Sequence, residues 1–333
     1  MLDVGRRQFI TLLGGAAAAW PRAGRAQQRE ITRRVGVLIG VAGDAETKGW
    51  VASFHGRLDE LGWKVGRNLQ IEERWSEGDP ARNRRLAGEL LAVKPDALFA
   101  FSSVAVAALQ QENGTVPIIF TAVSDPVGSG FVENLARPGR NVTGFTNFVP
   151  TMGAKWLEVL KEIAPQVQRV SLLFNPQTAP YVAEYYQRPF EAAAPLSGVQ
   201  AITTVVGETA ELENAIADFA REPGGGLVFP PDNFSYVHRE LIFALAARHR
   251  LPAIYPFRFM VREGGLISYG VDLGETFPRA AEYIDRVLRG ARPADLPVQA
   301  PTKFETTINL KTAKSLGLEV PPTLLGRADE VIE

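Results

Sequence analysis

The chain has 333 residues, a formal net charge of −1 and no cysteine. Without cysteine it forms no disulfide framework, carries no lipid on a cysteine and is no thiol enzyme. The nearly balanced charge does not suggest a nucleic-acid binder, for which a clustered basic surface is expected. The length allows one large domain or two of medium size, each able to bury a hydrophobic core.

The first 26 residues are typical of an export signal. Arg6 and Arg7 precede an apolar run over residues 9–19, and small residues follow up to Ala26. This order indicates a signal peptide cleaved near Ala26, and the paired arginines favour the twin-arginine route. The apolar run is too short to anchor the chain in a bilayer. We therefore expect a periplasmic mature protein without membrane insertion; a basic N-terminal helix docked on the core is the alternative.

Beyond the signal, short apolar runs alternate with helical patterns along the chain. In the first half, strands are expected at residues 35–39, 69–75, 97–101 and 118–122, and helices at about 50–61, 81–93 and 104–111. The same rhythm then begins again. In the second half, helices are expected at residues 156–163, 182–194, 212–221 and 240–250, and strands at 170–174, 199–206, 227–229 and 253–255.

Continuous apolar strands that alternate with helices predict an α/β fold whose parallel sheets are covered on both faces. Because the pattern occurs twice, we expect two Rossmann-like lobes with right-handed crossovers. The run Gly224 to Gly226 precedes a strand instead of following one. We interpret it as a loop and not as a phosphate-binding fingerprint.

In sheets of this kind, ligands bind at the carboxyl ends of the strands, beside helix N-termini. If the two lobes face each other, the loops after the strands line a single cleft. Polar and aromatic residues follow the strands in both halves: Ser102, Ser103, Ser124 and Asp125 in the first, and Asn175, Tyr181, Asp232, Asn233 and Tyr255 in the second. These residues are the candidate ligand contacts.

Their chemistry suggests a zwitterion or a hydroxylated acid. Ser102 and Ser103 precede a predicted helix, where hydroxyl and free N–H groups can hold a carboxylate. Asp125 can accept a hydrogen bond from an ammonium or hydroxyl group, and Tyr181 and Tyr255 can stack on a ligand. Helix capping by the serines and a turn at Asp125 before Pro126 are the alternative interpretations.

Enzymatic functions find little support. The three histidines, His55, His238 and His249, do not have the spacing of a metal site. No Gly-x-Ser-x-Gly sequence that would place a nucleophile is present. We therefore expect neither catalysis nor a metal or cofactor.

Several segments together are similar to the tryptophan/tyrosine-type substrate-binding proteins of ABC importers. They are TAVSDPVGSGFVENLARPGRNVTGF (121–145), PPDN (230–233), ISYGVDLGE (267–275) and INLKTAKSLGLEVPPTLL (308–325). The resemblance spans essentially the whole mature chain, and the segment from SDPVG to NVTGF is the most distinctive. It implies a type I periplasmic binding protein fold, with two α/β lobes joined by a hinge and a ligand between them.

The resemblance also assigns residues. Ser102 and Ser103 match the serine/threonine loop that holds a carboxylate, and Asp125 matches the family's Asp-Pro loop. Asp272 matches an acidic residue on the strand that crosses back between the lobes. Asp232 and Asn233 match the strand-end loop of the second lobe. Two departures concern that half of the pocket: Pro231 replaces a small hydroxyl residue, and residues 175–181 form a less typical loop.

We expect lobe 1 to comprise residues 33–145 and 273–300, and lobe 2 residues 146–272 and 301–330. The chain should cross between lobes at residues 141–148, 269–273 and 291–302. The expected function is that of a periplasmic receptor which binds a small carboxylate, amino-acid-like or aromatic, and delivers it to an inner-membrane ABC permease. We expect a monomer. A ligand-sensing partner of a membrane receptor without transport is the alternative, and an exported hydrolase is a distant third.

Overall fold

The computed structural model describes residues 32–41, 43–112 and 114–333. The expected export signal lies outside these residues. No helix within the described ranges is both long and apolar enough to cross a membrane.

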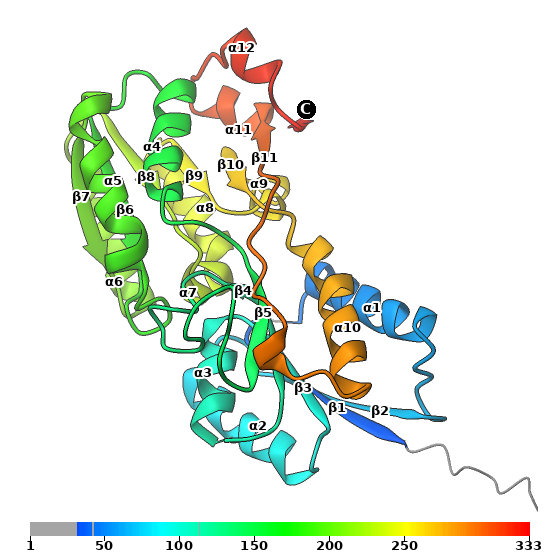
Figure 1. Cartoon of the computed structure of the whole chain (residues 1–333). Helices are drawn as coiled ribbons and strands as arrows, with labels where there is room; N and C mark the ends of the chain where they lie inside the picture. Colours follow the sequence, from blue (N-terminus) through cyan, green and yellow to red (C-terminus); the bar gives the residue numbers. More distant parts are fainter. Residues whose placement is uncertain (1–31, 42, 113) are drawn as a thin grey trace, which may run out of the picture. The chain divides into compact units, whose positions relative to one another are not determined.

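The first lobe is built on a parallel sheet of five strands (Figure 1). In spatial order they are β2 (Leu69–Trp75), β1 (Arg33–Ile39), β3 (Ala97–Phe101), β4 (Ile118–Val123) and β5 (Val142–Thr146). Two pairs of helices pack on this sheet: α1 (Ala45–Glu60) with α10 (Thr276–Leu288), and α2 (Pro80–Ala92) with α3 (Ser103–Glu112). Every residue of β3 is buried, as expected for a strand covered on both faces.

The second lobe is built on a sheet of seven strands. In spatial order they are β12 (Glu330–Ile332), β11 (Glu305–Asn309), β10 (Ile267–Gly270), β9 (Ala253–Tyr255), β8 (Gly225–Val228), β6 (Arg169–Phe174) and β7 (Gln200–Val205). From β7 to β10 the order repeats that of the first sheet from β2 to β5. The fold is therefore the expected pair of Rossmann-like lobes.

The helices of the second half alternate with these strands. They are α4 (Met152–Ile163), the π-helix η1 (Ala183–Gln187) continued by α5 (Arg188–Ala193), η2 (Pro195–Ser197), α6 (Thr209–Phe219), α7 (Asn233–Val237), α8 (Arg239–Arg248) and α9 (Arg258–Arg262). The later short elements are η3 (Leu273–Glu275), η4 (Pro293–Asp295), α11 (Leu310–Ser315) and α12 (Pro322–Leu325).

The chain passes between the two sheets three times: after β5, after β10 and before β11. The expected first crossing at 141–148 contains β5, a full strand of the first sheet, so the chain leaves that sheet only after Thr146. β11 is antiparallel to β10, unlike the expected parallel sheet. The reason is topological, because β10 leads out of the second lobe and β11 enters it from the same side. The lobe boundaries given above remain our proposal.

The expected loop at Gly224 to Gly226 is also wrong, because Gly225 and Gly226 lie within β8. A Cβ atom on Gly225 would come within 2.7 Å of the Phe219 ring, and one on Gly226 within 3.1 Å of Leu160 and Val167. Glycine here lets neighbouring side chains approach the strand closely.

Candidate functional site

Two adjoining cavities lie where the strand-end loops of the two lobes meet. The inner cavity, about 30 Å³, is lined by residues of both lobes, many of them polar, among them Ser102, Ser103, Asn147, Asp232 and Asn233. The outer cavity, about 390 Å³, has mostly apolar walls that include Val104, Ala107, Phe131, Pro180 and Tyr181. Ser103, Thr178 and Tyr181 line both cavities. The outer volume falls in the range of small-molecule sites, roughly 300–1,000 Å³.

The serine pair lies at the join between β3 and α3. Ser102 has a φ of +89°, a conformation that L-residues rarely adopt. Its backbone N–H donates to Thr121 O at 3.1 Å. A Cβ on Gly40 would come within 2.1 Å of Ser102 Oγ, so glycine at position 40 makes room for this serine. The loop is therefore held in a specific geometry by both neighbouring strands.

Some polar atoms around the cavities are buried and lack a partner. Within the described part of the chain, Ser103 Oγ, Ser124 Oγ and Asn147 Oδ1 have no hydrogen-bond partner. Ser103 and Asn147 line the cavities. Ser103 and Ser124 both lie close to the Tyr181 hydroxyl, and Ser124 also lies close to the Tyr186 hydroxyl. Leaving a buried polar group unpaired costs about 1–3 kcal/mol. Ser103 Oγ and Asn147 Oδ1, which line the cavities, are thus available to the polar groups of a ligand, and Ser103 Oγ does not cap its helix.

Asn147 was missed by the sequence reasoning. It follows β5 directly, and its polar side chain is buried between Thr146 and Phe148, which are buried too. The signal in the sequence is a polar residue directly after a buried strand, the position at which ligands bind in parallel sheets. The expected crossing at residues 141–148 hides this strand end.

Tyr181 forms a wall common to both cavities. Its hydroxyl donates to Pro231 O at 2.7 Å. Burial, and to a lesser degree the charge of Asp232, raises the pKa of this hydroxyl, so Tyr181 remains a neutral donor. Its ring is therefore fixed as a wall of both cavities, and its stacking on a ligand stays a prediction.

Asp232 is buried and is saturated by donors from its own lobe. It caps α7 through Phe234 N at 3.0 Å, accepts from Asn175 N at 2.8 Å and accepts from the Thr178 hydroxyl. Burial raises the pKa of its carboxyl to about 6. Asp232 lines the inner cavity, but its contacts show that it joins the loop after β6 to α7.

Asn175 supports the same loop instead of lining the two cavities. Its side chain donates to Gly207 O at 3.2 Å and accepts from Gln177 N at 2.8 Å. The described residues that line the inner and outer cavities do not include it. The structure therefore gives Asn175 a loop-supporting position, and its contact with a ligand stays a prediction.

Asn233 connects the two lobes. Its Nδ2 donates to Gly40 O at 2.9 Å and to Ser102 Oγ at 3.3 Å, both in the first lobe. The expected convergence of strand-end loops from both halves is thus present, with Asn233 at the contact itself.

Asp125 combines the two interpretations that the sequence left open. Its Oδ1 accepts a hydrogen bond from Gly128 N at 2.7 Å, and this bond closes the expected turn. It also lines the outer cavity, together with Glu184 of η1. The carboxylates of Asp125 and Glu184 favour donor groups on whatever occupies this cavity.

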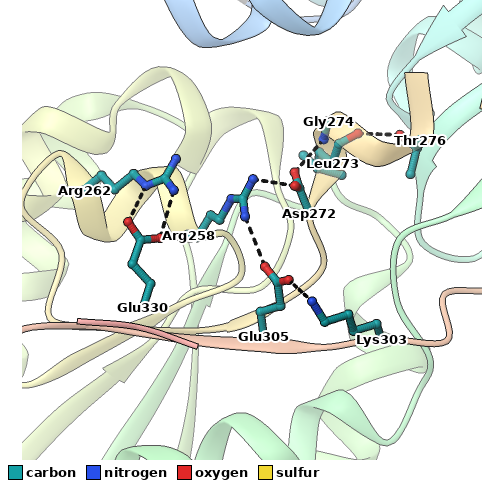
Figure 2. Close-up of polar contacts among 9 residues, drawn as sticks. All are labelled: Arg258, Arg262, Asp272, Leu273, Gly274, Thr276, Lys303, Glu305 and Glu330. Carbon is teal, nitrogen blue, oxygen red and sulfur yellow. Dashed lines mark hydrogen bonds and ion pairs between the residues drawn. The ribbon is translucent and has the colours of Figure 1, made fainter. Parts of the chain in front are cut away.

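Asp272 is placed differently from the expectation (Figure 2). Its Oδ1 accepts from Gly274 N at 2.8 Å and so caps η3, while its other oxygen pairs with Arg258. Arg258 also pairs with Glu305 at 3.2 Å, and Glu305 with Lys303 at 2.5 Å. The described residues lining the two cavities do not include Asp272. Its carboxylate is neutralised by Arg258 where the chain leaves β10, so it anchors a crossing segment.

Tyr255 is also not at the cavities. Its ring stacks on Phe229 with centroids 5.5 Å apart and meets the Phe243 ring edge to face at 5.2 Å. It is only 1% exposed. The side chain at the end of β9 points into the core of the second lobe, and the expected ligand stacking is not supported.

Residues 34–332 match the family model for ABC transporter substrate binding protein. The chain belongs to this family. A tyrosine-binding protein of Clostridioides difficile is 25% identical over 276 residues, which cover 83% of this chain and 77% of that protein.

Two solved structures are also similar. An ABC domain from Streptococcus pneumoniae in complex with L-Trp is 26% identical, with a TM-score of 0.83, and the match covers 90% of this chain and 100% of that one. A conserved domain protein from Vibrio cholerae is 27% identical with a TM-score of 0.83, over 90% and 99% of the two chains. The chain is thus a substrate-binding protein with the two-lobed fold expected from the sequence.

Proposed function

We propose that this substrate-binding protein is a periplasmic receptor for an amino acid with an aromatic or other bulky apolar side chain, which it delivers to an inner-membrane ABC permease. The observation that carries the proposal is the arrangement of the two cavities. A small inner cavity offers unpartnered polar atoms, and it shares Ser103, Thr178 and Tyr181 with a larger cavity that has mostly apolar walls.

The polar atoms suit the ends of an amino acid. Ser103 Oγ lies in the first turn of α3, where hydroxyl and backbone N–H groups favour a carboxylate. Asn147 Oδ1 and Asp125 are acceptors for an ammonium group. The walls formed by Phe131 and Tyr181 in the outer cavity suit an aromatic or aliphatic side chain.

The relatives support this ligand class. One is named a tyrosine-binding protein, and one was solved with L-Trp. We infer that the ligand is enclosed by rotation of the lobes about the three crossing segments. In the closed form the lobes then meet through the hydrogen bonds from Asn233 to Gly40 and Ser102.

The test is calorimetric titration with L-tyrosine and L-tryptophan, compared with L-glutamate and galactose. We expect one of the two aromatic amino acids to bind, and Ser103→Ala to weaken that binding about tenfold, since the lost hydrogen bond is worth roughly 1–3 kcal/mol. Ser315→Ala, an exposed hydroxyl on α11, is the matched control. Binding of galactose alone would contradict the proposed ligand class.

A further inference from the structure

A second set of contacts joins the lobes at the margin of the inner cavity, which Tyr236 lines. Asp44 precedes α1 in the first lobe and Arg239 begins α8 in the second, and their side chains form an ion pair at 3.0 Å. The Tyr236 hydroxyl donates to Asp44 Oδ2 at 2.9 Å and lies 2.8 Å from Thr47 Oγ1. We call Asp44, Thr47, Tyr236 and Arg239 the interlobe latch.

Each lobe holds its half of the interlobe latch in place. Asp44 is fixed as the N-cap of α1, because it accepts from Thr47 N and Thr47 Oγ1, both at 2.8 Å. Arg239 is fixed from the other side: it pairs with Glu263 at 2.5 Å, donates to Tyr236 O at 3.0 Å and lies over the Tyr236 ring at 4.9 Å. These contacts lie within one lobe, so they persist when the lobes separate.

Preorganisation makes the cross-lobe contact favourable. Both side chains are already ordered, so little rotamer entropy is lost when they meet. The Arg239 side chain is 11% exposed and that of Asp44 21%, and such a pair is less screened by water than a surface pair. Although burial opposes it, hydrogen bonds from Thr47 and Tyr236 and the charge of Arg239 lower the pKa of Asp44, which keeps the carboxylate ionised.

We infer that the Asp44–Arg239 pair determines ligand affinity from outside the cavities, as a contact made only when the lobes are closed. This inference rests on the closing motion in the proposed function. A ligand bound to the closed form gains the free energy of the Asp44–Arg239 pair without touching it, since the described residues that line the two cavities include neither side chain. Arg239 and Asp44 are then positioning residues, whose loss favours the open form and speeds ligand release.

The experiment measures lobe distance and ligand release in the same protein. Because the chain has no cysteine, Arg84→Cys on α2 and Glu213→Cys on α6, both exposed, place two spin labels without competing sites. Distance distributions and the dissociation rates of L-tyrosine and L-tryptophan are recorded for wild type and for Arg239→Gln. Arg169→Gln is the matched control, since Arg169 is similarly buried, pairs with Glu222 and lies over the Phe219 ring, all within the second lobe.

We expect Arg239→Gln to raise the dissociation constant and the dissociation rate about tenfold and to reduce the short-distance population. Arg169→Gln should change them less than twofold. Asp44→Asn, which retains a capping oxygen, should act like Arg239→Gln, and the double variant should lose no more than either single one. Unchanged release and distances in both single variants would overturn the inference.

The two proposals fail in different ways. If the wild type binds neither amino acid, the proposed ligand class fails, and the latch is decided by the ligand-free distances alone. A smaller short-distance population in Arg239→Gln than in wild type would then support the latch. Identical ligand-free distributions would overturn it.

Discussion

At the scale of single residues, the site contains buried polar atoms without a hydrogen-bond partner and others whose partners come from the protein itself. Ser103 and Asn147 expose unpaired atoms to the cavities, whereas the oxygens of Asp232 are filled by donors of the second lobe. A buried carboxylate that receives its donors from the protein shapes the pocket. Asp232, whose carboxyl pKa is raised by burial, therefore stabilises the loop and helix around it.

The raised pKa of Asp232 has a measurable effect on stability. Its carboxyl titrates at about pH 6 in the folded protein, against an ordinary value of 3.8. A group whose pKa is raised on folding adds stability below the ordinary value, and this addition is lost as the pH rises through the folded value. We expect the free energy of unfolding to lose up to about 3 kcal/mol from this group between pH 4 and pH 7.

The measurement is denaturant unfolding of wild type and Asp232→Asn across that pH range. Burial lowers the pKa of His238, which acts in the opposite direction, so the difference between the two proteins isolates Asp232. The variant lacks the titrating group, and its curve should not fall in the same way. Curves that run parallel from pH 4 to pH 7 would contradict the assignment.

At the scale of elements, the crossing segments are fixed by charges. Arg258 on α9 pairs with Asp272 at the exit from β10 and with Glu305 at the entry to β11, as Figure 2 shows. One guanidinium thus connects two of the three passages between the lobes. The position of Asp272 follows from this role and from the η3 cap.

We expect Asp272→Ala to lower the free energy of unfolding by about 1–2 kcal/mol, since a cap and an ion pair are lost. Affinity for L-tyrosine or L-tryptophan should change less than threefold, because the residue does not line the cavities. Asp272→Asn keeps a capping oxygen and should lose less stability. Calorimetry that shows a tenfold loss of affinity at unchanged stability would place Asp272 at the ligand.

Most strands could be predicted from the sequence, and the failures have physical reasons. Continuous apolar runs such as residues 97–101 identify strands buried on both faces, and β3 has these bounds. The sequence does not indicate strand β5, because Thr143, Gly144 and Thr146 interrupt its apolar pattern. Strand-end positions located Ser103 and Asn233, but they could not show that Tyr255 points into the core. The interlobe latch could not be predicted from the sequence, because Asp44 and Arg239 lie 195 residues apart and no local pattern connects them.

At the scale of the whole molecule, the contacts between the lobes should respond to ligand. If the lobes close on the ligand, small-angle scattering should give a smaller radius of gyration with saturating L-tyrosine or L-tryptophan than without it. Galactose serves as the control solute and should leave the curve unchanged. Superimposable curves for free and ligand-saturated protein would contradict closure.

The position of α10 also constrains how the chain acquires its fold. This helix follows the sheet strands of the second lobe from β6 to β10, yet it packs on α1 and places Phe277 against Phe99 and Phe101 of the first sheet. Arg57 and Glu282, which pair across the α1–α10 contact, are 225 residues apart. During synthesis, the aromatic surface formed by Phe99 and Phe101 therefore stays uncovered until α10 has been made, late in the chain. A chain that stops before residue 276 would keep that surface exposed to other molecules.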